Sequence, residues 1–196
     1  MNYDYTDKII LYIDKELIEE YSKLKCLASF DEINVLESVK TLRKKISALV
    51  RKAFRRLANN VYNDNRKVNG VQHIDNDWID FLLSTYDPVS KYSFDAELER
   101  KCARLTEAIL ASSTKTQEID AALRAMSFMC RIYADRITDE AVMQAYKDDG
   151  EDYVLWVAEN DAKTCSVCRK RNGKIYETDN VPPDPHPNCR CRRERV

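Results

Sequence analysis

The residues best suited to chemistry are cysteines and one histidine near the C-terminus. Four of the seven cysteines and one of the two histidines fall in the phrases DAKTCSVCRKRNGKIY and PPDPHPNCRCRRERV. A C-x2-C turn places two thiolates on one cation, and a second donor pair about 15 to 20 residues later completes a tetrahedral site. We therefore expect structural Zn²⁺ bound by four of five candidates: Cys165, Cys168, His186, Cys189 and Cys191.

The choice among these five stays open at the level of sequence. In an extended segment Cys189 and Cys191 point to the same side of the chain, so both can bind one ion. The alternative set replaces one of them with His186. The mixed histidine and cysteine set favours zinc over an iron–sulfur cluster.

Other fates of the thiols remain as alternatives. One or two disulfides would form if the protein ends up in an extracellular particle, or some thiols stay free. The odd cysteine count and an N-terminus without a signal-peptide pattern favour folding in a reducing cytoplasm. The three other cysteines lie in helical patterns and are expected to be buried apolar side chains: Cys26, Cys102 and Cys130.

A catalytic role has less support. PDPHPNC loosely resembles the metal-finger nucleases, in which a histidine activates water beside a zinc-stapled scaffold. Such a site needs further His or Asn side chains, and the other histidine, His73, lies far away in a polar stretch. A nucleophilic Cys-His pair is disfavoured because these cysteines have metal-ligand spacing. We expect no enzyme and no small-molecule substrate. Two alternatives remain, a metal-dependent nuclease using His186 and a zinc-containing nucleic-acid-binding protein.

The elements that must position the cluster are mainly helical. Only 3 Gly and 5 Pro occur in 196 residues, so turn residues are scarce and long helices are expected. Apolar residues recur at steps of three and four over 6–27 and again from Asp31 to about Asn63. This periodicity predicts two amphipathic helices packed as a hairpin over 6–63.

Further helices are expected within 75–135, one of them starting at Asp95. The last helical pattern covers 117–149, with Gly150 as its C-terminal stop. The pattern predicts a helical body over 1–135 and a C-terminal Cys/His module over 136–196.

After Gly150 the chain changes character. YVLWVAE and GKIYE are rich in β-forming residues and predict a short β-hairpin. Too little apolar sequence remains there to build a core, so a metal should hold the module together. The expected fold is mainly α, with long amphipathic helices followed by a small α+β Cys/His module.

The ordered motifs of about 132–196 resemble the phage Mu F-like head morphogenesis family, the minor head proteins of tailed phages. Its phrases appear in order as RITDEAVMQAYKDDG, YVLWVAENDAKTC, CSVCRKRNGKIY and PPDPHPNCRC. RITDE departs from the family's Arg-Thr-Glu phrase, and the N-terminal helices match none of its phrases. The matching positions are Trp156, Asp161, Thr164, Cys165, Cys168, Gly173, His186, Pro187, Cys189, Arg190 and Cys191.

The resemblance implies a minor capsid protein, present at low copy at the portal vertex, that takes part in head morphogenesis. The implied partners are the portal protein and the major capsid or scaffold protein, with packaged DNA as a further candidate. The implied location is the host cytoplasm during assembly and then the virion. No run approaches about 18 apolar residues, so no membrane partner is expected.

A basic helical segment could contact nucleic acid or an acidic partner. Eight basic residues and no acid lie between Lys40 and Arg56. Such a stripe suits DNA or an acidic portal surface, but a solvated helix face is the alternative. The candidate contacts are Lys44, Lys45, Arg51, Lys52, Arg55 and Arg56.

The tail is a second basic spot, with arginines at positions 190, 192, 193 and 195. These arginines either meet a partner or pair with the acidic residues of 148–152. Net charge is −1, so the whole molecule is not a general polyanion binder.

Overall fold

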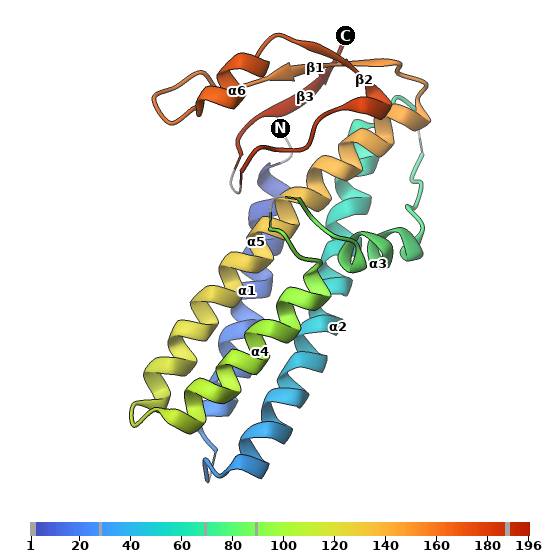
Figure 1. Cartoon of the computed structure of the whole chain (residues 1–196). Helices are drawn as coiled ribbons and strands as arrows, with labels where there is room; N and C mark the ends of the chain where they lie inside the picture. The colour runs from blue at the N-terminus through green and yellow to red at the C-terminus, as the bar shows by residue number, and fades with distance from the viewer. Residues whose placement is uncertain (1–2, 28, 69, 89, 187–188) are drawn as a thin grey trace.

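Long helices form the body of the protein (Figure 1). The computed structural model describes residues 3–27, 29–68, 70–88, 90–186 and 189–196, so Pro187 lies outside the described residues. The bundle consists of α1 (Tyr3–Lys25), α2 (Glu32–Asn65), α4 (Phe94–Ala111) and α5 (Lys115–Asp148). The short α3 (Asn76–Ser84) packs against α2 and α4.

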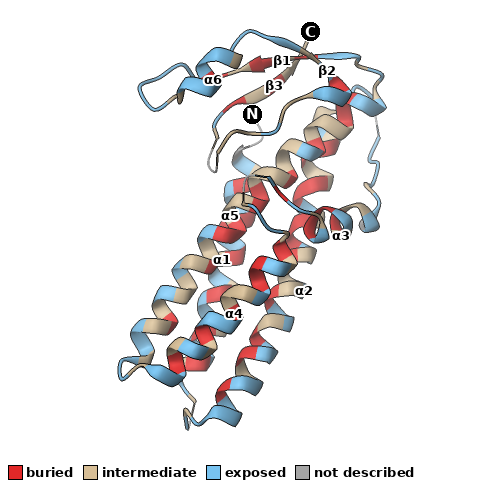
Figure 2. Ribbon diagram, viewed as in Figure 1, coloured by how far each residue is buried: buried red, intermediate tan, exposed pale blue. Residues whose placement is uncertain are grey.

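The apolar periodicity of the helices becomes the core of the bundle. α5 packs against α1, α2 and α4, and α1 packs against α2 as the predicted hairpin. Figure 2 shows the buried residues along the inward sides of these helices. Ile13, Leu17, Val50 and Leu57 are all fully buried, and burying one such side chain stabilises the fold by roughly 1.5–3 kcal/mol. The core explains why the helices associate.

Local signals fix the helix ends. The Asp31 carboxylate accepts a hydrogen bond from the Asn34 N–H at 2.9 Å, which caps α2. α4 begins at Phe94 with Ser93 as its cap, so the expected start at Asp95 was wrong by one residue. A neutral serine hydroxyl takes the cap position and leaves Asp95 in the first turn, where an acid suits the helix dipole.

α5 ends at Asp148, and Gly150 follows its C-cap as the predicted stop. This glycine has φ of 75°, its N–H donates to the Lys147 carbonyl at 2.9 Å, and the Glu151 N–H donates to the Tyr146 carbonyl at 3.0 Å. α5 runs without interruption through residue 135, and the division of the chain at 135/136 stays a prediction.

A small antiparallel sheet lies across one end of the bundle (Figure 1). Its order is β2-β1-β3, from β1 (Tyr153–Val157), β2 (Ile175–Glu177) and β3 (Arg192–Arg195). The predicted hairpin of β1 and β2 is confirmed, whereas no pattern in the sequence predicted β3. α6 (Ser166–Arg171) and the 3₁₀ turn η1 (Thr178–Asn180) complete the module.

The sheet contributes to two cores. Val154 of β1 belongs to the core of the bundle. Trp156, two residues further along the same strand, belongs to a second, small core. That second core holds the buried residues Trp156, Ala158, Cys168 and Cys191. Two of its four residues are candidate metal ligands, so the module depends on the chemistry of its cysteines.

Candidate metal centre

The first ligand pair lies at the start of α6. Cys165 is the N-cap of this helix, and the Cys168 N–H donates to the Cys165 sulfur at 3.3 Å. This N–H bond is the main reason that the pKa of Cys165 is lowered to about 7. The backbone at the start of α6 therefore favours a thiolate at Cys165, which is the form that binds metal.

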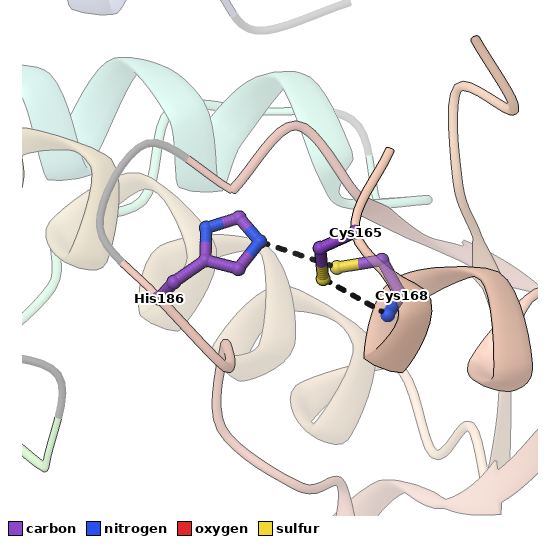
Figure 3. A group of neighbouring side chains, drawn as sticks. All are labelled: Cys165, Cys168 and His186. Carbon is purple, nitrogen blue, oxygen red and sulfur yellow. Dashed lines mark hydrogen bonds between the residues drawn. The ribbon is translucent and has the colours of Figure 1, made fainter. Parts of the chain in front are cut away.

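The chain between β2 and β3 brings the other donors to this turn. Figure 3 shows the imidazole of His186 pointing at the two sulfurs from a separate segment. The Nε2 atom of His186 lies 3.7 Å from the Cys168 sulfur. The Cys189 sulfur lies 3.5 Å from the same Cys168 sulfur.

These distances between donor atoms fit tetrahedral coordination of one zinc ion. With Zn–S bonds of about 2.3 Å and Zn–N bonds of about 2.0 Å, neighbouring donor atoms lie roughly 3.5–3.8 Å apart. The donor atoms form two groups, Cys165–Cys168–His186 and Cys168–Cys189–Cys191, and within each group all lie within 4.8 Å of one another. All five predicted candidates are thus brought together, with Cys168 common to both groups, and the cluster could hold a metal ion.

Burial of Cys168 and Cys189 disfavours their thiolate forms unless a positive charge lies nearby. Burial raises the pKa of the Cys168 thiol to about 12, and burial followed by the nearby Asp184 carboxylate raises the pKa of Cys189 further. Burial therefore favours the protonated form of both thiols. A divalent cation would displace those protons, because only the deprotonated form is a ligand.

Arg193 joins the segment that carries Asp184 and His186 to the bundle. Its guanidinium donates to Asp139 of α5 at 3.0 Å and to Asp184, two residues before His186, at 2.7 Å. The guanidinium carbons of Arg193 and Arg171 lie 4.3 Å and 4.8 Å from the centroid of the Trp156 ring. Sequence reasoning missed this network. The available signals were the acids inside the RITDE and PDPH phrases.

The nuclease hypothesis depends on a single histidine in the cluster. His186 faces the cysteines, while His73 is exposed on the segment between α2 and α3. In the part of the chain that the structure describes, no further group of three His, Cys, Asp or Glu donors converges. Cys26, expected to be buried, is exposed because it follows the last residue of α1, while Cys102 and Cys130 are buried as predicted.

The structure divides the six basic candidates on α2. Arg51 is paired with Asp80 of α3 and Asp95 of α4, at 3.0 Å and 2.8 Å. Arg55 is also paired with Asp80, and Lys45 with an acid of α1. The remaining three are exposed: Lys44, Lys52 and Arg56.

The basic tail is paired with acids inside the chain. Arg195 binds Asp149 at 2.6 Å and also pairs with Glu151, as one of the two hypotheses for the tail expected. Arg190 holds Asp161 at 2.6 Å, and this bond is the main reason that the pKa of Asp161 lies well below its usual range. The arginines of the tail thus bind acids on other segments of the chain.

The described helices include none that is long and apolar enough to span a membrane.

Comparison with known proteins gives one family. A family model described as "Phage Mu protein F like protein" matches residues 97–194. This range is half of the chain and runs from α4 into β3, so it contains all five candidate ligands and begins upstream of the resemblance at 132–196. No curated protein and no solved structure matches the chain.

Proposed function

The chain belongs to the Phage Mu protein F like family, and on this basis we propose that it is a minor head protein of a tailed phage. The observation that carries this proposal is the family match over the C-terminal half, where the ordered motifs form one module. In this function the protein acts in head morphogenesis at the portal vertex, by binding and not by catalysis. Its partners are the portal protein and the major capsid or scaffold protein.

In this proposal zinc keeps the C-terminal module folded. Among the described residues, the small core around Trp156 contains four buried ones, two of them cysteines of the cluster. A structural zinc ion supplies folding free energy directly, because the assembled site does not exist in the unfolded chain. Four of the five donors would hold the ion, and its chemistry there is structural.

The outer face of the bundle offers a surface for a partner. Leu11 and Ile18 of α1 are 70% and 55% exposed, and their spacing of seven places them on one side of the helix. Their burial by a partner would remove apolar surface from water. Lys44, Lys52 and Arg56 of α2 are the candidates for contact with packaged DNA. No specific observation favours the nuclease or the nucleic-acid-binding regulator, and both stay predictions.

The test is the protein's place in the particle. Purified procapsids and virions of the parent phage should contain the chain at a copy number far below that of the major capsid protein. Chemical cross-linking should join it to the portal protein. Absence from both particles would refute the proposal.

A matched pair of variants tests the surface on α1. We expect Leu11→Glu with Ile18→Glu to reduce incorporation into heads while the purified protein stays folded. Arg104→Glu on α4 is the control, because it changes the net charge by the same amount at an exposed position outside α1. Equal incorporation of both variants would remove α1 from the proposed contact.

A further inference from the structure

One small cavity is lined by four of the five candidate ligands. The cavity has a volume of about 30 Å³, and its lining includes Cys165, Cys168, His186 and Cys191. One water molecule needs roughly 10–15 Å³, so this space suits a single ion and is too small for an organic cofactor. Cys189 is not among the described residues that line this cavity.

Cys189 instead lines two other cavities, of about 340 Å³ and 140 Å³, together with Asp139 and Arg193. Cys191 also lines the larger of these and His186 the smaller, so the ion-sized cavity is the one that distinguishes Cys189 from them. Both cavities lie against α5, where the Arg193 network joins the module to the bundle. Cys189 thus borders the space beside the helix and not the ion-sized space.

Distance alone does not choose between Cys189 and Cys191. The 3.5 Å between the Cys189 and Cys168 sulfurs suits two ligands of one ion, and it equally suits a hydrogen bond between a thiol and a thiolate. Burial and backbone position favour Cys191. It is 5% exposed, packs in the core with Trp156 and immediately precedes β3, whose pairing with β1 fixes its position.

We propose that the ion is bound by Cys165, Cys168, His186 and Cys191, and that Cys189 is a neighbouring thiol that hydrogen-bonds to the Cys168 sulfur. This assignment rests on the zinc ion of the proposed function and specifies its ligands. It gives a site of three thiolates and one imidazole. Cys189 acts on the metal through Cys168, as a positioning residue.

Single substitutions test the assignment by zinc affinity, measured by competition with a chromogenic chelator. Loss of an outer partner of a ligand typically weakens metal binding by about 10–100-fold. We expect Cys189→Ser to weaken zinc binding by about tenfold, at the low end of this range. Cys165→Ser, Cys168→Ser, His186→Ala and Cys191→Ser should each weaken it by more than about 100-fold. Cys26→Ser is the control for thiol loss, because Cys26 is exposed outside the cluster.

Cobalt substitution of the unmodified protein keeps the test independent of variant folding. The near-ultraviolet absorption of bound Co²⁺ grows with each cobalt–thiolate bond, so the spectrum should report three thiolates. Cys189→Ser should leave that spectrum unchanged.

The outcomes separate this assignment from the zinc proposal itself. A wild-type protein that binds no zinc would refute the structural zinc. A wild-type protein that binds the metal through four thiolates would overturn only the ligand assignment. The same holds if zinc affinity survives substitution of His186 or Cys191 but is lost on substitution of Cys189.

Discussion

The guanidinium of Arg193 lies over the ring of Trp156, with its central carbon 4.3 Å from the ring centroid. The two residues are cross-strand partners on β3 and β1. Because Arg193 also binds Asp139 of α5 and Asp184, two residues before His186, its side chain joins the sheet, the bundle and the candidate metal site.

Replacing Arg193 should destabilise the fold strongly. Its side chain is only 6% exposed, so Arg193→Met leaves two acids at the module interface without their counter-charge. Removing one partner of a buried ion pair costs about 3–5 kcal/mol. We expect a loss of about 3 kcal/mol in the free energy of unfolding, measured by urea denaturation. Lys170→Ala, on the exposed side of α6, should change it by less than about 0.5 kcal/mol. A loss below about 1 kcal/mol for Arg193→Met would contradict this role.

Removing the metal should unfold the module and spare the bundle. The buried residues of the small core form a different cluster from those of the helices, with Tyr176 and Val181 packed against both, so most of the packing between helices does not depend on the ion. In a Trp78→Phe background, where Trp156 is the remaining tryptophan, a chelator should shift the Trp156 emission to longer wavelength. Amide hydrogen exchange should accelerate in β1 and β3. Equal acceleration in α2 and α5 would show that the two parts unfold together, and chelator presaturated with zinc is the control.

Asp135 should make stability fall as pH rises. Burial raises the pKa of this carboxyl from 3.8 to about 6. Its folded pKa is raised, so its contribution is fully present below the unfolded pKa and is lost as pH rises through the folded pKa. Asp135→Asn should therefore stabilise the protein, and its gain over wild type should grow by roughly 1 kcal/mol between pH 5 and pH 7.5.

Urea denaturation at several pH values checks this expectation. Glu140→Gln, an exposed acid five residues further along α5, is the control and should show no such trend. A gain that is constant between pH 5 and pH 7.5 would mean that Asp135 does not titrate there.

Arg51 should matter for stability more than its neighbour Lys52. Arg51 joins α2 to α3 and α4 through Asp80 and Asp95, and its side chain is 23% exposed. We expect Arg51→Ala to lower the free energy of unfolding by about 1 kcal/mol, because hydrogen bonds to charged groups are lost. Lys52→Ala is exposed and should have almost no effect on it. Equal effects of the two substitutions would show that the ion pairs do not hold the helices together.

Much of the fold follows from local sequence patterns. Apolar steps of three and four fix the inward side of α1 and α2, and Gly150 stops α5 because it adopts a positive φ at low cost. Spacing alone also identified the five candidate donors that the structure brings together. These features depend on short stretches of chain, so the residues involved are sufficient to predict them.

The remaining features needed the tertiary structure. Residues 192–195 (RRER) have little β propensity of their own, and they form β3 because β1 offers an edge to pair with. Arg51 looks like part of one basic stripe until α3 and α4 bring acids to it. Cys189 and Cys191 are equivalent by spacing, and only the folded chain places Cys191, and not Cys189, at the ion-sized cavity. Residue types and their spacing thus identify the side chains that could bind a metal. Which of those side chains face one space depends on contacts between segments far apart in the chain, so it is visible only in the folded protein.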